Sequence, residues 1–255
     1  MKINCFSHRM FNTSTPFSPI KLPSQMETHL WYALPNEVKS QSLLNQYVDL
    51  LSPLEKDHIF SISALHLQKS ALLARALVRT TISRYQIGSQ VNPRSLEFRK
   101  NPHGKPEIGI DVEDKQRTMK NNILSFAKRY FTFEEVELLS AISDPEVQRH
   151  EFIKLWTLKE AYVKALGRGF SGAPFSTFTI RFRSVNPDSE DSEIVIVPLE
   201  KPSELTTNWQ FAQVELAGSH YAAICRESNG GGAPMKVVVR KTIPLVEEHI
   251  VSEID

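Results

Sequence analysis

Two carboxylates stand close together in residues 109–113, which read GIDVE. In an extended strand alternate side chains share a face, so Asp111 and Glu113 point the same way, about 7 Å apart, with Ile110 and Val112 opposite. Two carboxylates at this spacing can share a hard divalent cation such as Mg²⁺, which prefers oxygen ligands. The alternative is a half-buried strand with one solvated face, and the pair by itself leaves both interpretations open.

A second group of chemically capable residues lies in residues 152–164, which read FIKLWTLKEAYVK. The apolar residues of this segment predict a helix with a wide face buried in a core. Glu160 and Lys164 are i,i+4 neighbours on that helix, and such an ion pair stabilises a helix by only about 0.2–0.5 kcal/mol. The functional alternative makes Glu160 a third metal ligand and Lys164 a contact for phosphate.

The elements that must position these residues alternate between helices and strands, which predicts an α+β fold. Ser52 before Pro53 predicts a helix start, and Thr132 is expected to interrupt a helical stretch. The periodicity predicts helices over residues 67–86, 120–142 and 147–166, and Gly167 and Gly169 are expected to end the last of them. Strands are predicted after Met26 and at residues 96–99, 108–113, 176–183, 193–198, 208–216, 220–225 and 236–240.

A weak internal repeat suggests two similar halves. The order helix, glycine, proline-bearing loop and phenylalanine-containing strand occurs at residues 67–99 and again at 147–183. Chance recurrence of common elements explains this order equally well. The predicted organisation is a leader at 1–25, an N-terminal half at 26–107, a C-terminal half with the metal site at 108–228 and a tail at 229–255.

The charge of the chain is neutral overall and uneven along its length. The net charge is +1, but residues 54–107 carry nine Lys and Arg against four Asp and Glu, and residues 108–200 carry twelve against fifteen. A basic half and an acidic half suit a phosphate-rich ligand with a divalent cation. The small net charge and the lack of a long apolar run argue against nucleic-acid and membrane partners.

Several other classes of site are excluded by missing residues. The two cysteines, Cys5 and Cys225, cannot build a disulfide framework and indicate isolated thiols in a reducing compartment. No P-loop, GxSxG or HExxH motif is present, no GxGxxG follows a predicted strand, and the histidines are scattered. These observations predict an intracellular globular protein.

The first 25 residues differ from the rest in composition. They contain no Asp or Glu and are rich in Ser and Thr, which is typical of an organelle transit peptide. A disordered N-terminal segment without a targeting signal explains the composition as well. The expected location is therefore the cytoplasm, with a mitochondrion or plastid as the alternative.

Taken together, the two motifs resemble one protein family. GIDVE, followed about forty residues later by WTLKEAYVK, is similar to the pattern of the 4′-phosphopantetheinyl transferases, of the monomeric, two-half type that includes the surfactin-synthetase-activating enzyme. Gly104-Lys105-Pro106, the helix containing Leu77-Val-Arg79, and residues 165–169 (ALGRG) match the same type. The resemblance covers about residues 27–225.

The resemblance implies two pseudo-twofold α+β halves, each a small, mainly antiparallel sheet on a long helix. It implies a monomer that transfers the 4′-phosphopantetheine arm of coenzyme A to a serine of an acyl, aryl or peptidyl carrier protein, in fatty-acid, lysine or another pathway. The implied residue roles are Mg²⁺ ligation by Asp111, Glu113 and Glu160, coenzyme A binding by Lys105, Arg79 and Lys164, and catalysis by Glu160, Lys164 and Glu113.

One segment of the family pattern is absent. The family has an N-x-S-H motif and an apolar strand between G-K-P and G-I-D-x-E, whereas Pro106 is followed here only by Glu107 and Ile108 before Gly109. We therefore expect the first half to lack a strand and two coenzyme A contacts. Three outcomes stay open: an active transferase, a non-catalytic protein that binds coenzyme A or a carrier, and a chain that does not fold stably.

Overall fold

The computed structural model describes residues 19–86, 91–98, 108–119, 122–167, 173–184, 192–199, 209–228 and 235–254. The chain divides into two compact units. The first comprises Met1–Lys100 together with Lys236–Asp255, and the second comprises Asn101–Met235. The leader predicted at 1–25 lies mostly outside the described residues.

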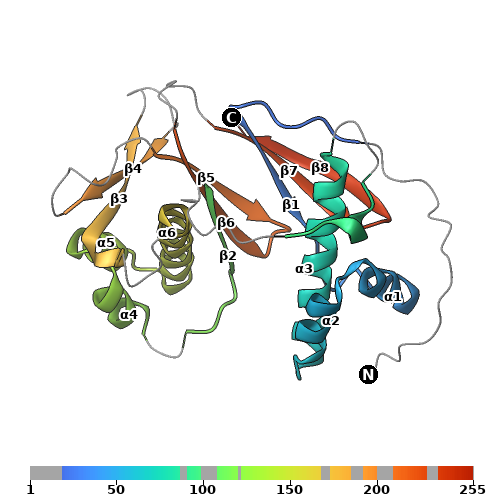
Figure 1. The fold of residues 1–255 in the computed structure, drawn as a ribbon. Helices are drawn as coiled ribbons and strands as arrows, with labels where there is room; N and C mark the ends of the chain where they lie inside the picture. The colour runs from blue at the N-terminus through green and yellow to red at the C-terminus, as the bar shows by residue number, and fades with distance from the viewer. Residues whose placement is uncertain are drawn as a thin grey trace. The chain divides into compact units, whose positions relative to one another are not determined.

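The first unit joins three helices to a three-stranded sheet. Its elements are β1 (Glu27–Tyr32), α1 (Gln41–Leu50), α2 (Pro53–Phe60), α3 (Leu65–Arg84), the 3₁₀ helix η1 (Pro93–Ser95), β7 (Lys236–Ile243) and β8 (Glu247–Ile254). The sheet order is β1-β7-β8, with β1 parallel to β7 and β7 antiparallel to β8. Helices α1 and α2 lie beside α3, and their apolar side chains form the core of this unit (Figure 1).

Residues 229–255, predicted to be a tail, instead contribute two strands to the first unit. Residues 236–254 form β7 and β8, and β7 lies between the other two strands. Val237, Val238 and Val239 are all at most 3% exposed, as in a strand covered on both faces. The apolar run predicted a strand here, but its partner, β1, lies about two hundred residues earlier in the chain.

The second unit is built around one long helix. Its elements are β2 (Ile108–Asp114), α4 (Ile123–Tyr130), α5 (Phe133–Ser140), α6 (Pro145–Leu166), η2 (Phe175–Thr177), β3 (Phe178–Ser184), β4 (Ser192–Pro198), β5 (Trp209–Leu216) and β6 (His220–Glu227). Strands β2, β6 and β5 form an antiparallel sheet in that order, and β3 pairs with β4. Helix α6 packs on β2 and β6, and the large apolar core surrounds it (Figure 1). The α+β class is confirmed.

The helix starts repeat between the units at a constant spacing. Ser52 caps α2, and Glu55 binds back to the backbone N–H of Ser52 at 2.9 Å; eighty residues later Thr132 caps α5, and Glu135 binds back to its N–H at 3.0 Å. These two capping boxes stabilise each helix start by satisfying backbone donors that have no partner within the helix. The predicted break near Thr132 is thereby confirmed.

A buried ion pair repeats at the same spacing. The guanidinium of Arg79 in α3 binds the Glu55 carboxylate, with Nη2 at 2.6 Å and Nε at 3.1 Å. Lys159 in α6 binds Glu135, with Nζ 2.8 Å from Oε1. Each long helix is thus fastened to the helix before it through one buried cation. This repeat at an eighty-residue spacing differs from the repeat inferred from the sequence, whose first copy included a strand at residues 96–99.

The strand predicted at residues 96–99 is wrong over its described part. Leu96 follows η1 and is not in a strand. Arg79 Nη1 donates hydrogen bonds to the carbonyl oxygens of Pro93 at 2.8 Å and Leu96 at 3.1 Å. A side chain therefore satisfies backbone acceptors that a strand would direct to a neighbouring strand.

Substitution of a β7 valine tests whether the C-terminal strands belong to the first unit. Val238→Asp places a charge at a site that is 3% exposed, and we expect it to destabilise this unit by about 3 kcal/mol or more. Val251→Asp on β8, where the side chain is 54% exposed, should change stability by less than about 0.5 kcal/mol. Urea unfolding followed by hydrogen exchange of β1 and α3 peptides measures both; equal effects would contradict the assignment.

Candidate functional site

The site begins with a very close approach between β2 and α6 at Gly109. A Cβ atom at this position would lie 2.0 Å from the carbonyl oxygen of Ala161 and 2.4 Å from the backbone nitrogen of Ala165. Neither backbone atom can move without shifting the helix, so only glycine permits the contact. This approach lays β2 along the C-terminal half of α6, where Glu160 and Lys164 are found.

The two faces of β2 are the reverse of an ordinary half-buried strand. Asp111 is 8% exposed, on the side that faces α6, whereas Ile108, Ile110 and Val112 are 41–50% exposed on the other side. The prediction that Asp111 and Glu113 share a face is confirmed. The strand is half-buried, as the alternative interpretation also expected, but the carboxylates lie on its covered side and the apolar residues on its exposed side.

Asp111 and Lys164 meet across the contact between β2 and α6. Lys164 Nζ lies 2.7 Å from Asp111 Oδ1 and donates a second hydrogen bond, of 3.0 Å, to the carbonyl oxygen of Ile110. The other carboxylate oxygen, Asp111 Oδ2, is buried and has no hydrogen-bond partner among the described residues. A buried carboxylate oxygen without a donor is costly and indicates an interaction that this part of the chain does not supply.

Glu113 and Glu160 complete a group of three carboxylates. Burial raises the pKa of Glu113, and the negative charges of Asp111 and Glu160 raise it further. Burial and the charge of Asp111 likewise raise the pKa of Glu160. Arg117 opposes this by pairing with the Glu113 carboxylate. The carboxylates are therefore close enough to repel one another in a partly desolvated place.

The donor set fits a hard divalent cation. In the described part of the chain, no group of three or more His, Cys, Asp or Glu side chains is arranged so that it could hold a metal ion as it stands. Asp111, Glu113 and Glu160 nevertheless offer carboxylate oxygens, which Mg²⁺ prefers, and no described residue donates a hydrogen bond to Asp111 Oδ2. A cation among them would also relieve the repulsion that raises the pKa values of the two glutamates.

Lys159 does not face the carboxylates, although it precedes Glu160. Its side chain is 0% exposed, and its Nζ donates to the carbonyl oxygens of Phe175 at 2.8 Å and Phe178 at 2.6 Å as well as to Glu135. Burial lowers the pKa of Lys159 to about 8, against the opposing effect of Glu135. We therefore infer that the bonds of Lys159 fix how α6 is turned about its own axis. In this orientation Glu160 and Lys164 face β2.

Two further predicted residues lie away from this cluster. Arg79 is 2% exposed in the first unit, and its guanidinium is engaged by Glu55 and by carbonyl oxygens. This placement favours a structural role over the coenzyme A contact that the resemblance implies. Lys105, with its neighbours Gly104 and Pro106, lies outside the described residues.

The sequence reasoning missed Glu135, Lys159 and Arg117. The signal for the first two was the eighty-residue spacing, because Glu135 repeats Glu55 and Lys159 repeats Arg79. Arg117 had no such signal. Its guanidinium lies 5.7 Å from the centre of the Trp156 ring, and only the fold brings these two residues together.

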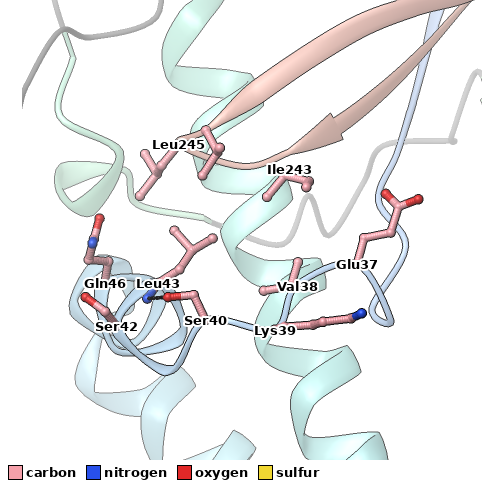
Figure 2. A pocket seen from close by; sticks show the side chains of 10 residues that line it. Glu37, Val38, Lys39, Ser40, Ser42, Leu43, Gln46, Ile243 and Leu245 are labelled. Atoms are coloured by element: carbon pink, nitrogen blue, oxygen red, sulfur yellow. Dashed lines mark hydrogen bonds between the residues drawn. The ribbon is translucent and has the colours of Figure 1, made fainter.

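A pocket in the first unit is lined by none of the residues predicted to form the functional site. It is about 470 Å³ in volume and lies at the start of α1, between Val38, Leu43 and the turn after β7 (Figure 2). Its charged residues are Glu37 and Lys39, and Glu37 pairs with Lys241 at 2.5 Å. The predicted site residues that the structure brings together lie on β2 and α6 instead.

None of the described helices is long and apolar enough to cross a membrane.

The segment that contains β2 and α6 has relatives among known proteins. Residues 107–225 match the 4′-phosphopantetheinyl transferase superfamily. The matched segment contains Asp111, Glu113, Glu160 and Lys164, so the whole carboxylate cluster lies within it.

Individual relatives extend this similarity. The 4′-phosphopantetheinyl transferase HetI of Nostoc sp. is 34% identical over 110 residues, which cover 43% of this chain and 38% of that protein. The 4′-phosphopantetheinyl transferase Sfp of Bacillus subtilis is 27% identical over 168 residues, covering 56% of this chain and 71% of that protein. The chain spans less than half the length of HetI and of two other curated relatives, of which it covers 31% and 43%.

A solved structure also matches part of the chain. It is a holo-(acyl-carrier-protein) synthase from Bacillus anthracis in complex with CoA (3′,5′-ADP), with 18% sequence identity and a TM-score of 0.37. The match covers 48% of this chain and 96% of the synthase.

Substitution of Gly109 tests the contact that builds the site. In Gly109→Ala the new Cβ would overlap the backbone of α6, and we expect the second unit to lose about 3 kcal/mol or more of stability. Gly218→Ala is the control: Gly218 has a φ of 69° but open space around it, so the expected loss is about 1–2 kcal/mol. Urea unfolding measures both, and a smaller loss for Gly109→Ala would contradict the close approach.

Burial of the Glu160 carboxylate, together with its repulsion by Asp111, predicts a pH-dependent gain in stability for Glu160→Gln. The pKa of Glu160 is raised above 4.5 in the folded protein, so its ionisation lowers the free energy of unfolding as the pH rises through that folded value. With chelator present, Glu160→Gln should therefore be more stable than wild type at pH 7 and equal to it at pH 4, as judged by urea midpoints. Arg149 lowers the pKa of Glu146 on the same helix, so Glu146→Gln should not gain stability at pH 7. A loss in Glu160→Gln at pH 7 would refute the repulsion.

Proposed function

We propose that this protein transfers the 4′-phosphopantetheine group of coenzyme A to a serine of an acyl or peptidyl carrier protein. The observation that carries the proposal is the buried, half-partnered carboxylate of Asp111 beside Lys164, Glu113 and Glu160, within the segment that matches the transferase superfamily. Three carboxylates and a lysine suit a pyrophosphate held with a divalent cation.

Asp111, Glu113 and Glu160 would hold Mg²⁺ in this proposal. When bound, the cation would offset the charge of the coenzyme A pyrophosphate. Lys164 reaches the same place from α6, with 48% of its side chain exposed, and would donate to a phosphate oxygen as negative charge builds there. Lys105 would add a contact to coenzyme A.

The chemistry assigned to these residues is one displacement at phosphorus. The serine oxygen forms a bond to the phosphorus next to pantetheine, the pyrophosphate P–O bond breaks, and 3′,5′-adenosine bisphosphate leaves with the bonding electrons. Glu160 would accept the serine proton as the general base. Glu113 acting through a water is the alternative base.

The remaining assignments belong to the same proposal. The protein would act as a monomer of the two-half type, without nucleic-acid or membrane partners, in the cytoplasm or in a mitochondrion or plastid. The carrier would serve fatty-acid, lysine or another pathway. Because the N-x-S-H segment is missing, a second candidate is a non-catalytic protein that binds coenzyme A or a carrier.

A transfer assay separates the two candidates. Purified protein is incubated with an apo-carrier protein, coenzyme A and Mg²⁺, and the carrier mass is measured. We expect a gain of one phosphopantetheine, and at least about a hundredfold slower transfer for Asp111→Ala and Glu160→Ala because each removes a metal ligand. Glu151→Ala, on the exposed side of α6 and paired with Lys154, is the matched control and should transfer normally. Coenzyme A binding without any mass gain would favour the second candidate.

A further inference from the structure

Two of the three site carboxylates are paired with cations of the same chain. Lys164 holds Asp111, with Nζ 2.7 Å from Oδ1, and Arg117 Nη1 binds Glu113 Oε1. Glu160 has no such partner among the described ion pairs, but the positive charges of both Lys164 and Arg117 act on it and oppose the rise in its pKa. Lys164 and Arg117 thus each bring one positive charge to the three carboxylates.

The two partners in each pair differ in burial. The side chains of Asp111 and Glu113 are 10% and 20% exposed, whereas those of Lys164 and Arg117 are 48% and 40% exposed. The carboxylates are fixed on β2 against α6. The cations stand on the solvent side at the ends of long, flexible side chains, so they can leave the carboxylates without disturbing the core.

Arg117 is placed at the cluster by the fold. The turn after β2 holds its backbone, with the Arg117 N–H donating to the carbonyl oxygen of Asp114 at 3.0 Å. Its guanidinium lies over the Trp156 ring, one helical turn before Glu160 on α6. The ring keeps the guanidinium beside the carboxylates with or without the ion pair to Glu113, since a guanidinium over an indole is itself favourable.

We propose that Arg117 and Lys164 are exchangeable counter-ions: they neutralise Glu113 and Asp111 until a divalent cation takes those carboxylates, and then bind the phosphate groups of the incoming ligand. Arg117 thereby becomes a phosphate-binding residue that neither the motifs nor the resemblance assigned. The inference rests on the cation site of the proposed function.

The exchange follows from competition for the same oxygens. A divalent cation on Asp111 and Glu113 replaces two single charges and frees an ammonium and a guanidinium at the exposed edge of the site. Both groups then lie beside any phosphate that the cation binds, and a guanidinium suits phosphate oxygens in pairs. Binding of the cation and of a phosphate ligand should therefore help each other, by the same factor in either order.

Two binding measurements with opposite expected signs test the proposal. Mn²⁺ affinity is measured by electron paramagnetic resonance on protein without phosphate, and pyrophosphate affinity is measured by calorimetry on Mn²⁺-loaded protein. In Arg117→Gln, Mn²⁺ should bind about three- to fivefold more tightly because a competing charge is gone. Pyrophosphate should bind roughly tenfold more weakly because a charged donor is gone. Lys164→Gln should shift both affinities in the same directions.

The matched control is Arg129→Gln. Arg129 is an exposed arginine of α4 that also lies over an aromatic ring, 5.4 Å from the centre of Tyr130, so its loss removes the same charge and the same kind of contact elsewhere in the unit. Both affinities should stay as in wild type. Arg117→Lys keeps the charge and should restore most of the pyrophosphate affinity, while urea midpoints check that each variant is folded.

The results that overturn the proposal are distinct from those that overturn the transfer function. Unchanged Mn²⁺ affinity in Arg117→Gln, a loss of both affinities, or an equal response in Arg129→Gln would each refute exchange, as would wild-type protein that does not bind Mn²⁺. If wild type binds Mn²⁺ and pyrophosphate with the expected variant effects but does not modify a carrier, the exchange stands and the transfer function is refuted.

Discussion

The candidate site depends on one backbone contact, between Gly109 of β2 and the Ala161–Ala165 turn of α6. With no side chain between them, strand and helix come close enough for Lys164 to reach both Asp111 and the carbonyl oxygen of Ile110. A larger residue would push the strand and the helix apart, because its Cβ would overlap the backbone of α6. The glycine of GIDVE is therefore a structural requirement of the chemistry carried by the two acidic residues that follow it.

The orientation of α6 depends in turn on the buried ion pair of Glu135 and Lys159. Glu135 also caps α5 and accepts the backbone N–H of Ile180 at 2.9 Å, so one carboxylate joins α5, α6 and β3. Breaking a buried pair leaves an uncompensated charge, which makes this arrangement a strict one. The first unit repeats it with Glu55 and Arg79, where it fastens α3 to α2, to η1 and to Leu96 just after η1.

The site gains its binding capacity at the expense of local stability. Three carboxylates lie partly desolvated near one another, so their ionisation opposes folding while it prepares oxygen ligands for a cation. Lys164 and Arg117 moderate the repulsion from the solvent side, and a bound cation would remove more of it. An energetically unfavourable cluster of this kind is typical of functional sites and contrasts with the fully paired Glu135 and Lys159 nearby.

The sequence by itself determined what depends on neighbours along the chain. It placed Asp111 and Glu113 on one face, Glu160 and Lys164 one turn apart on a helix, a helix start at Ser52 and a break at Thr132. Strand period, helix period and capping are local properties. Only the tertiary structure decided which face of β2 is covered, that Arg117 joins the site, and that Arg79 is engaged inside the first unit. It also decided that β7 pairs with β1, two hundred residues away. The period of a strand or helix determines which side chains share a face. What covers that face depends on which distant segments pack against it, and all segments of the chain compete for burial.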